Sequence, residues 1–237
     1  MSIKYVFFDL DGTLLPMDQD LFSKKYFVNL TRKLASQGYD IKEVEKSIQN
    51  VLASMIKNDG YATNEAKCWG ALAAGLGEGI LNDKSGFDDF YENDFDKLID
   101  TCGCNPMAAN VISQLHIMGI KPVLATNPLF PSVATEKRIK WAGLNKNDFE
   151  YVSTYENSCF SKPNPMYYTE ILDKLKLNAD ECMMVGNDTA EDMIAASLGM
   201  KVFLVTDCLI NKNNIDISLF PHGNLEALLE YIKININ

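Results

Sequence analysis

The chain has 237 residues, of which 47% are hydrophobic, and its formal net charge is −10. This length and composition suit one large domain or a core with an insertion, and they exclude global disorder. The acidic balance disfavours nucleic acid as the main partner, because a phosphate backbone carries the same sign of charge. No apolar run reaches the roughly 18 residues of a membrane span. The start, Met1-Ser2-Ile3-Lys4-Tyr5, lacks a secretory cleavage site, so we expect a cytoplasmic protein.

The first predicted element is a strand over residues 4–8, where Val6, Phe7 and Phe8 suit a buried position. Two carboxylates, Asp9 and Asp11, follow it directly. Residues 17 to 104 then show helical patterns without a convincing strand, and we expect about four helices in this block.

From residue 105 onward, helical and strand patterns alternate. Such alternation predicts parallel strands joined by helical crossovers, with helices on both faces of the sheet. The sequence therefore predicts an α/β, Rossmann-like three-layer core over 1–16 and 105–237, with an inserted all-helical cap over 17–104. The expected helices are 106–118, 132–142, 165–175, 190–199 and 223–234, and the expected strands are 121–126, 150–153, 182–186 and 201–205.

The cysteines and histidines give little support for a metal site of their own. Of six cysteines, Cys102 and Cys104 alone are closely spaced, so reduced thiols are favoured over a zinc site or redox pair. The two histidines are too few for a histidine-built metal site, and His116 is expected to be a packed or surface residue.

Polar side chains follow several of the predicted strands. In open α/β sheets, ligands bind at the carboxyl ends of the strands, so these side chains are expected to converge on one edge. The converging set comprises Asp9, Asp11, Thr126, Asn127, Asn187, Asp188 and Asp192, with Lys162 in the loop before a helix.

A set of carboxylates, a hydroxyl and one lysine suits phosphoryl transfer through a covalent carboxyl-phosphate. An anionic nucleophile needs a cation between itself and the phosphate, and Mg²⁺ prefers hard oxygen ligands. A second carboxyl can protonate the leaving alkoxide and later activate water. Asp9 and Asp11 are therefore expected to face the phosphate together, with Gly12 letting backbone amides approach the anion.

Four segments, "DLDGTL", the "TN" at 126–127, "KPNP" and "GNDTAED", resemble in order the motifs of the haloacid dehalogenase superfamily. The block 17–104 resembles the α-helical, C1-type cap that this superfamily inserts after its first motif. The resemblance implies that Asp9 is the nucleophile and Asp11 the general acid/base. It also implies that Mg²⁺ is held by the Asp9 carboxylate, the Asp11 carbonyl and Asp188.

The resemblance implies supporting roles for the remaining residues. Thr126 would bind phosphoryl oxygens, with Asn127 lining the pocket beside it, and Lys162 would offset charge on Asp9 and the phosphate. Asp192 would orient either the metal's waters or Lys162. The last motif reads Gly186-Asn187-Asp188 rather than the commoner Gly-Asp, which leaves Asn187 as a possible supporting group.

The resulting prediction is a Mg²⁺-dependent phosphatase acting on a small phosphorylated metabolite. An aspartate at the place of Asp11 favours phosphate esters over carbon–halogen bonds. A phosphosugar mutase of the same superfamily remains an alternative, as does a catalytically weak binding or regulatory member. The sequence leaves the metabolite and the oligomeric state open.

Overall fold

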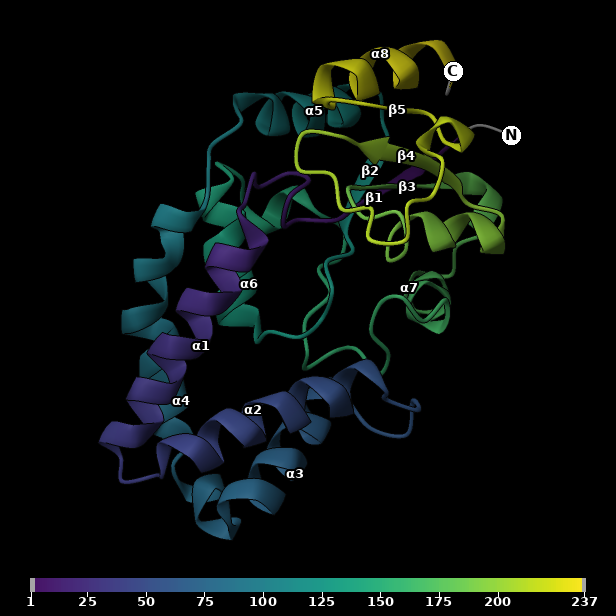
Figure 1. Cartoon of the computed structure of the whole chain (residues 1–237). Helices are drawn as coiled ribbons and strands as arrows, with labels where there is room; N and C mark the ends of the chain where they lie inside the picture. The colour runs from purple at the N-terminus through teal and green to yellow at the C-terminus, as the bar shows by residue number, and fades with distance from the viewer. Residues whose placement is uncertain (1–2, 236–237) are drawn as a thin grey trace.

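The computed structural model describes residues 3–235, which form an α/β core and a helical insertion (Figure 1). The five strands are parallel and lie in the order β2-β1-β3-β4-β5. In the register of the sheet, Phe8 lies opposite Leu124 on one side and Val185 on the other. Their bounds are β1 (Tyr5–Phe8), β2 (Lys121–Leu124), β3 (Cys182–Gly186), β4 (Lys201–Val205) and β5 (His222–Gly223).

Alternate residues of β1 point to opposite faces of the sheet, as strand geometry requires. Val6 and Phe8 share an apolar cluster with α5 (Pro106–Ile117) and α8 (Leu225–Asn235), whereas Phe7 clusters with α7 (Met166–Leu175) and η6 (Met193–Leu198). Figure 1 shows α5 and α8 together on one face of the sheet and α7 on the other. The predicted three-layer α/β architecture is confirmed.

The insertion between β1 and β2 is helical, also as predicted. The side chains of Asp18, Asp40 and Thr63 accept backbone hydrogen bonds at the N-termini of its three long helices. The expected fourth helix is instead divided, because the five-residue step from Phe90 to Phe95 needs a wider π turn to keep both rings buried. The segments are α1 (Gln19–Ser36), α2 (Ile41–Ile56), α3 (Asn64–Leu76), η1 (Glu78–Asn82), α4 (Lys84–Asp89), η2 (Phe90–Asp94) and η3 (Phe95–Thr101).

The two chain segments at the base of the insertion lie side by side. Met17 pairs with Cys102 in an antiparallel bridge, and the Gly103 amide donates to the Pro16 carbonyl at 2.7 Å. This pairing supports the proposed cap boundaries of 17–104. All six cysteines are free thiols, and no helix within residues 3–235 has the length and apolar character to cross a membrane.

Two predicted core elements differ from the structure. The predicted strand 150–153 does lie parallel to β2, with backbone hydrogen bonds from the Glu150, Leu124 and Ser153 amides at 2.8, 2.8 and 3.0 Å, but it forms only one bridge, Val152 to Leu124. Asn157 then folds the chain back by bonding Val152 and Thr154. The predicted helix 190–199 is the shorter 3₁₀ helix η6. Asp188 Oδ1 accepts the amides of Ala190 and Glu191, as an N-cap does, but the regular helical turns begin only at Met193.

Candidate active site

Asp9 lies where the strand order of the sheet reverses. Its amide donates to the Val185 carbonyl of β3 at 2.9 Å, and the preceding Phe8 carbonyl accepts from Ala125 beyond β2 at 2.7 Å. In parallel sheets this reversal opens a crevice at the carboxyl ends of the strands. Asp9, with 8% of its surface exposed, therefore sits in the position where such sheets bind ligands.

Lys162, in the loop that precedes α7, holds Asp9. Its ammonium donates to Asp9 Oδ1 at 3.0 Å and to Asp192 Oδ1 at 2.6 Å, and both Lys162 and Asp192 are 1% exposed. Burial alone would lower the pKa of Lys162, yet the carboxylates of Asp192 and Asp9 raise it well above its usual range. Lys162 is therefore a permanent cation beside Asp9.

Asp188 joins this network through Asp192. The Asp188 amide donates to Asp192 Oδ2 at 3.0 Å, while Asp188 Oδ1 accepts the amides of Ala190 and Glu191 at 2.7 and 3.0 Å. A continuous hydrogen-bonded path thus runs from Asp9 through Lys162 and Asp192 to Asp188. The two strand ends that carry Asp9 and Asp188 are adjacent, because β1 pairs with β3.

Asp11 is held by a residue that the sequence analysis did not single out. Its Oδ2 accepts an ion-paired hydrogen bond from Arg138 of α6 (Ser132–Trp141). The Arg138 guanidinium is 1% exposed, lies 4.5 Å from the Phe130 ring centre, and also bonds Ala134 and Thr135. Burial raises the pKa of Asp11, against the opposing effect of Arg138. Asp11 Oδ1 is buried and has no hydrogen-bond partner within residues 3–235.

Gly12 and Asn187 pack against each other behind the carboxylates. Gly12 has φ +84, and a Cβ atom there would lie 2.2 Å from Asn187 Nδ2. Asn187 accepts from the Thr13 hydroxyl at 3.2 Å and donates to the Cys208 carbonyl at 2.6 Å. The extra residue in the last motif therefore ties three loops together, and glycine is required at position 12.

Thr126 and Asn127 follow β2 at the same edge. The Thr126 carbonyl accepts from Ser153 and Tyr167 at 2.7 and 2.8 Å, which fixes the backbone. Its hydroxyl has no partner in the described part of the chain and can bind a further oxygen. Asn127 Nδ2 donates to Glu191 at 3.0 Å, while its Oδ1 is buried and unpartnered there.

The insertion reaches the site through Asn64 at the start of α3. Asn64 is fully buried, and its amide group donates to the Pro128 carbonyl at 3.1 Å and the Ser161 hydroxyl at 3.0 Å. These two acceptors adjoin Asn127 and Lys162 in sequence. The insertion is thus fastened to the loops that carry two of the site residues.

The model of haloacid dehalogenase-like hydrolases matches residues 3–198 of this chain. The chain belongs to this family. A curated relative, the phosphoglycolate phosphatase of Vibrio parahaemolyticus serotype O3:K6 (strain RIMD 2210633), is 26% identical over 245 residues, covering 99% of this chain and 98% of the relative.

Solved structures share the fold over nearly the whole length. A HAD phosphatase from Thermococcus onnurineus is 19% identical, covers 99% of both chains and gives a TM-score of 0.60. A predicted phosphoglycolate phosphatase from Haemophilus somnus 129PT is 18% identical, with 97% and 98% coverage and a TM-score of 0.57. The L-2-haloacid dehalogenase of Xanthobacter autotrophicus is 19% identical, with 98% coverage of both chains and a TM-score of 0.54. These likenesses show the hydrolase fold, shared by phosphatases and dehalogenases.

Three oxygen atoms of this hydrolase site are free to bind a cation. Asp9 Oδ2 and Asp188 Oδ2 have no hydrogen-bond partner in residues 3–235, and the Asp11 carbonyl accepts a single bond, from Gln19 at 3.0 Å. The described chain contains no group of three or more His, Cys, Asp or Glu side chains arranged to hold a metal. The set implied by the family resemblance needs two carboxylates and one carbonyl, and these hard oxygen donors suit Mg²⁺.

The electrostatic environment of Asp9 also suits a bound cation. Burial raises the pKa of Asp9 to about 8, with the Asp192 and Asp11 charges adding to the effect and Lys162 opposing it. An adjacent cation would favour the ionised carboxylate that a nucleophile requires.

Four contacts of the site were missed by sequence reasoning: those of Arg138, Asn64, Gln19 and Glu191. Arg138 carried a signal, because it shares the buried stripe of α6 with Ala134 and Ile139. A lone arginine in a core register needs a buried partner. Asn64 looked like an ordinary residue of a helix N-terminus.

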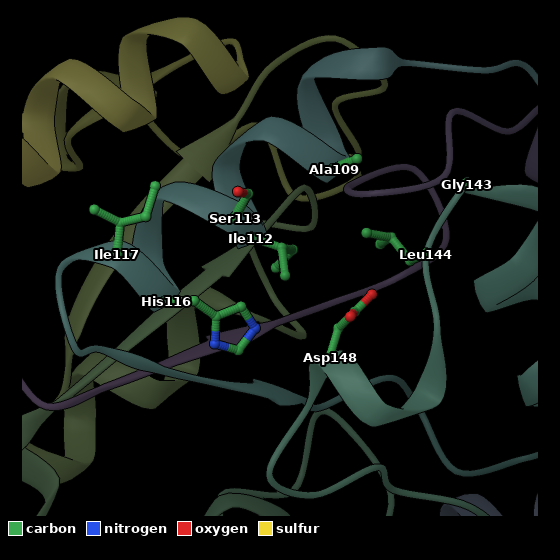
Figure 2. A pocket seen from close by; sticks show the side chains of 8 residues that line it. All are labelled: Ala109, Ile112, Ser113, His116, Ile117, Gly143, Leu144 and Asp148. Carbon is green, nitrogen blue, oxygen red and sulfur yellow. The ribbon is translucent and has the colours of Figure 1, made fainter.

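A separate surface hollow lies between α5 and the segment after α6 (Figure 2). Its volume is about 470 Å³, and His116 and Asp148 are the ionisable side chains among the residues that line it. His116 is exposed, as expected, and the hollow contains none of the residues assigned above to the active site.

Proposed function

We propose that this hydrolase is a Mg²⁺-dependent phosphatase that cleaves the phosphate monoester of a small metabolite through an aspartyl-phosphate on Asp9. The observation that carries the proposal is the charge arrangement around Asp9. One oxygen of its carboxylate is held by the buried Lys162 at 3.0 Å, and the other has no protein partner in the described chain. The curated relative's name supports the same reaction class.

In the proposed reaction, the Asp9 carboxylate attacks phosphorus and the bond to the ester oxygen breaks. Asp11, in its protonated form, gives its proton to the leaving alkoxide and afterwards accepts one from the attacking water. Lys162 and the Thr126 hydroxyl stabilise charge on the transferred group. A Mg²⁺ ion held by Asp9, the Asp11 carbonyl and Asp188 would reduce the repulsion between the two anions.

The presence of Asp11 supports a phosphatase rather than a dehalogenase, although the fold is common to both. A carbon–halogen bond releases a halide, which needs no proton, whereas an alkoxide does. Product analysis with a sugar phosphate separates hydrolysis from phosphosugar mutation, because a mutase returns the phosphoryl group to the sugar. The six free thiols fit a reducing compartment, which supports the proposed cytoplasmic location.

The decisive experiment replaces the nucleophile. Asp9→Asn should abolish hydrolysis of a generic aryl phosphate while circular dichroism and thermal unfolding still report a folded protein. Asp173→Asn, an exposed aspartate of α7, is the matched control and should retain full activity. Mass spectrometry should detect no phosphoenzyme in Asp9→Asn. Full activity of this variant would exclude Asp9 as the nucleophile.

A further inference from the structure

The insertion encloses a second cavity, of about 480 Å³, between its helices and the core segment 129–133. Its walls are mainly apolar and aromatic, with Phe22 and Tyr26 from α1, Val51 from α2 and Leu72 from α3 among them. Voids much larger than a water molecule are rare in packed interiors. This volume instead falls within the range of about 300–1,000 Å³ that is usual for small-molecule sites.

The polar atoms of the cavity do not call for a polar ligand. The Tyr26 and Tyr91 hydroxyls bond each other at 2.8 Å, which satisfies both groups within the wall. Trp69 contributes one buried N–H without a hydrogen-bond partner in the described chain. An occupant of the inner part of this space must therefore be mostly apolar. Three further polar side chains of the lining, Ser23, Asp88 and Lys212, are exposed.

The core side of the cavity is built mainly by two loops, one that follows the site residues Thr126 and Asn127 and one that bonds the loop of Asn187. Leu129, Phe130 and Pro131 line it three to five residues after Thr126, and the Phe130 ring faces the guanidinium of Arg138, which holds Asp11.

The second loop brings Lys212, which forms no ion pair among residues 3–235. It lies two residues after Ile210, whose amide and carbonyl bond Asn187 and Thr189. The cavity is thus built next to the loops that carry the phosphate site, and its lining contains one cation, Lys212, and one carboxylate, Asp88.

We propose that this cavity binds the organic part of the substrate, which is an apolar group such as a medium-length alkyl or aryl chain esterified to phosphate. The inference rests on the proposed phosphatase function and narrows it. Phosphoglycolate, the substrate in the curated relative's name, has a two-carbon acidic group that would leave an apolar space of this size unfilled.

The test is a series of n-alkyl phosphates, from methyl to octyl, assayed as kcat/KM with the full chain and Mg²⁺. Each buried methylene should raise kcat/KM by about fourfold until the cavity is full, and hexyl phosphate should exceed phosphoglycolate. Val51→Phe projects into the cavity and should lower the hexyl-to-methyl ratio at least about tenfold. Ile41→Phe, at an exposed position of the same helix, should leave the ratio unchanged.

Binding of the non-hydrolysable n-alkylphosphonates, measured by calorimetry, separates the two proposals. The cavity proposal is supported if affinity grows with chain length in the wild type and this growth is lost in Val51→Phe. That holds even when no ester is hydrolysed. Absence of hydrolysis would refute the phosphatase proposal. Hydrolysis without any dependence on chain length in either assay overturns the cavity proposal alone. A preference for phosphoglycolate over hexyl phosphate also overturns it.

Discussion

Replacing Arg138 with glutamine should destabilise the fold through its effect on Asp11. Arg138 is 1% exposed, and the Asp11 side chain is 19% exposed, so the substitution leaves a largely buried carboxylate without its cation. Removing one partner of a buried ion pair costs about 3–5 kcal/mol. Water can reach part of Asp11, so we expect the lower end, about 3 kcal/mol, and a fall in Tm of about 6–12 °C for a chain of this size.

The stability lost in Arg138→Gln should be larger at high pH than at low pH. Burial raises the pKa of Asp11 while Arg138 opposes that rise, so removing Arg138 raises the pKa further. Above the folded-state pKa, Asp11 is ionised and the ion pair contributes in full. As the pH falls through that pKa, Asp11 becomes neutral and the contribution of the pair disappears. Arg138→Gln should therefore lose more stability at about pH 8 than at about pH 5.

Urea unfolding at both pH values measures this difference, with Lys140→Gln, an exposed position of the same segment, as control. The double variant Asp11→Asn with Arg138→Gln should be more stable than the sum of the two single losses predicts. Any of three outcomes would refute the reasoning. They are a loss of unfolding free energy below about 1 kcal/mol in Arg138→Gln, an equal loss at both pH values, and additive losses in the double variant.

Three further outcomes follow from the site. Exhaustive chelation should remove hydrolysis of an aryl phosphate, and added Mg²⁺ should restore it; activity that survives chelation would contradict the donor set at Asp9 and Asp188. Lys162→Met should lower kcat by roughly 10²–10³-fold because it removes the cation beside Asp9, and a smaller fall in steady-state assays would argue against that role. Gly12→Ala should unfold at lower urea than Gly38→Ala. Both glycines have positive φ, but a Cβ at Gly38 meets nothing within 4 Å, whereas one at Gly12 meets Asn187.

The fold was predictable from the sequence because its signals are local. Apolar runs such as 182–186 predicted buried strands, and helical spacing between them predicted crossovers. The site followed from that topology, since Asp9 and Asp188 come from strand ends that a parallel sheet brings to one edge. The strand order itself was not predictable, because pairing between distant segments leaves no periodic trace in either one.

The sequence predicted less where contacts between distant segments override a local pattern. Residues 150–153 look like a strand and do bond β2 through three backbone hydrogen bonds, but Asn157 ends the pairing after the bridge at Val152. Residues 190–199 look like an α-helix, yet only Met193–Leu198 are helical, and they form a 3₁₀ helix. Arg138 and Asp11 lie 127 positions apart in the sequence. The helical pattern showed that Arg138 is buried, but it could not identify Asp11 as the partner of Arg138.

The charges at the sheet edge give a physical reason for the cation in the proposed reaction. Asp9 and Asp192 pair with the buried Lys162 and Asp11 pairs with the buried Arg138, whereas Asp188 forms no ion pair within residues 3–235. Two negative charges of these four aspartates therefore remain unbalanced. Burying such an excess is unfavourable, and it is expressed in the raised pKa values of Asp9 and Asp11. The divalent cation of the proposed reaction would supply the missing charge. A phosphate dianion entering beside Asp9 increases the need for that cation, so metal and phosphate must strengthen each other's binding by the same factor.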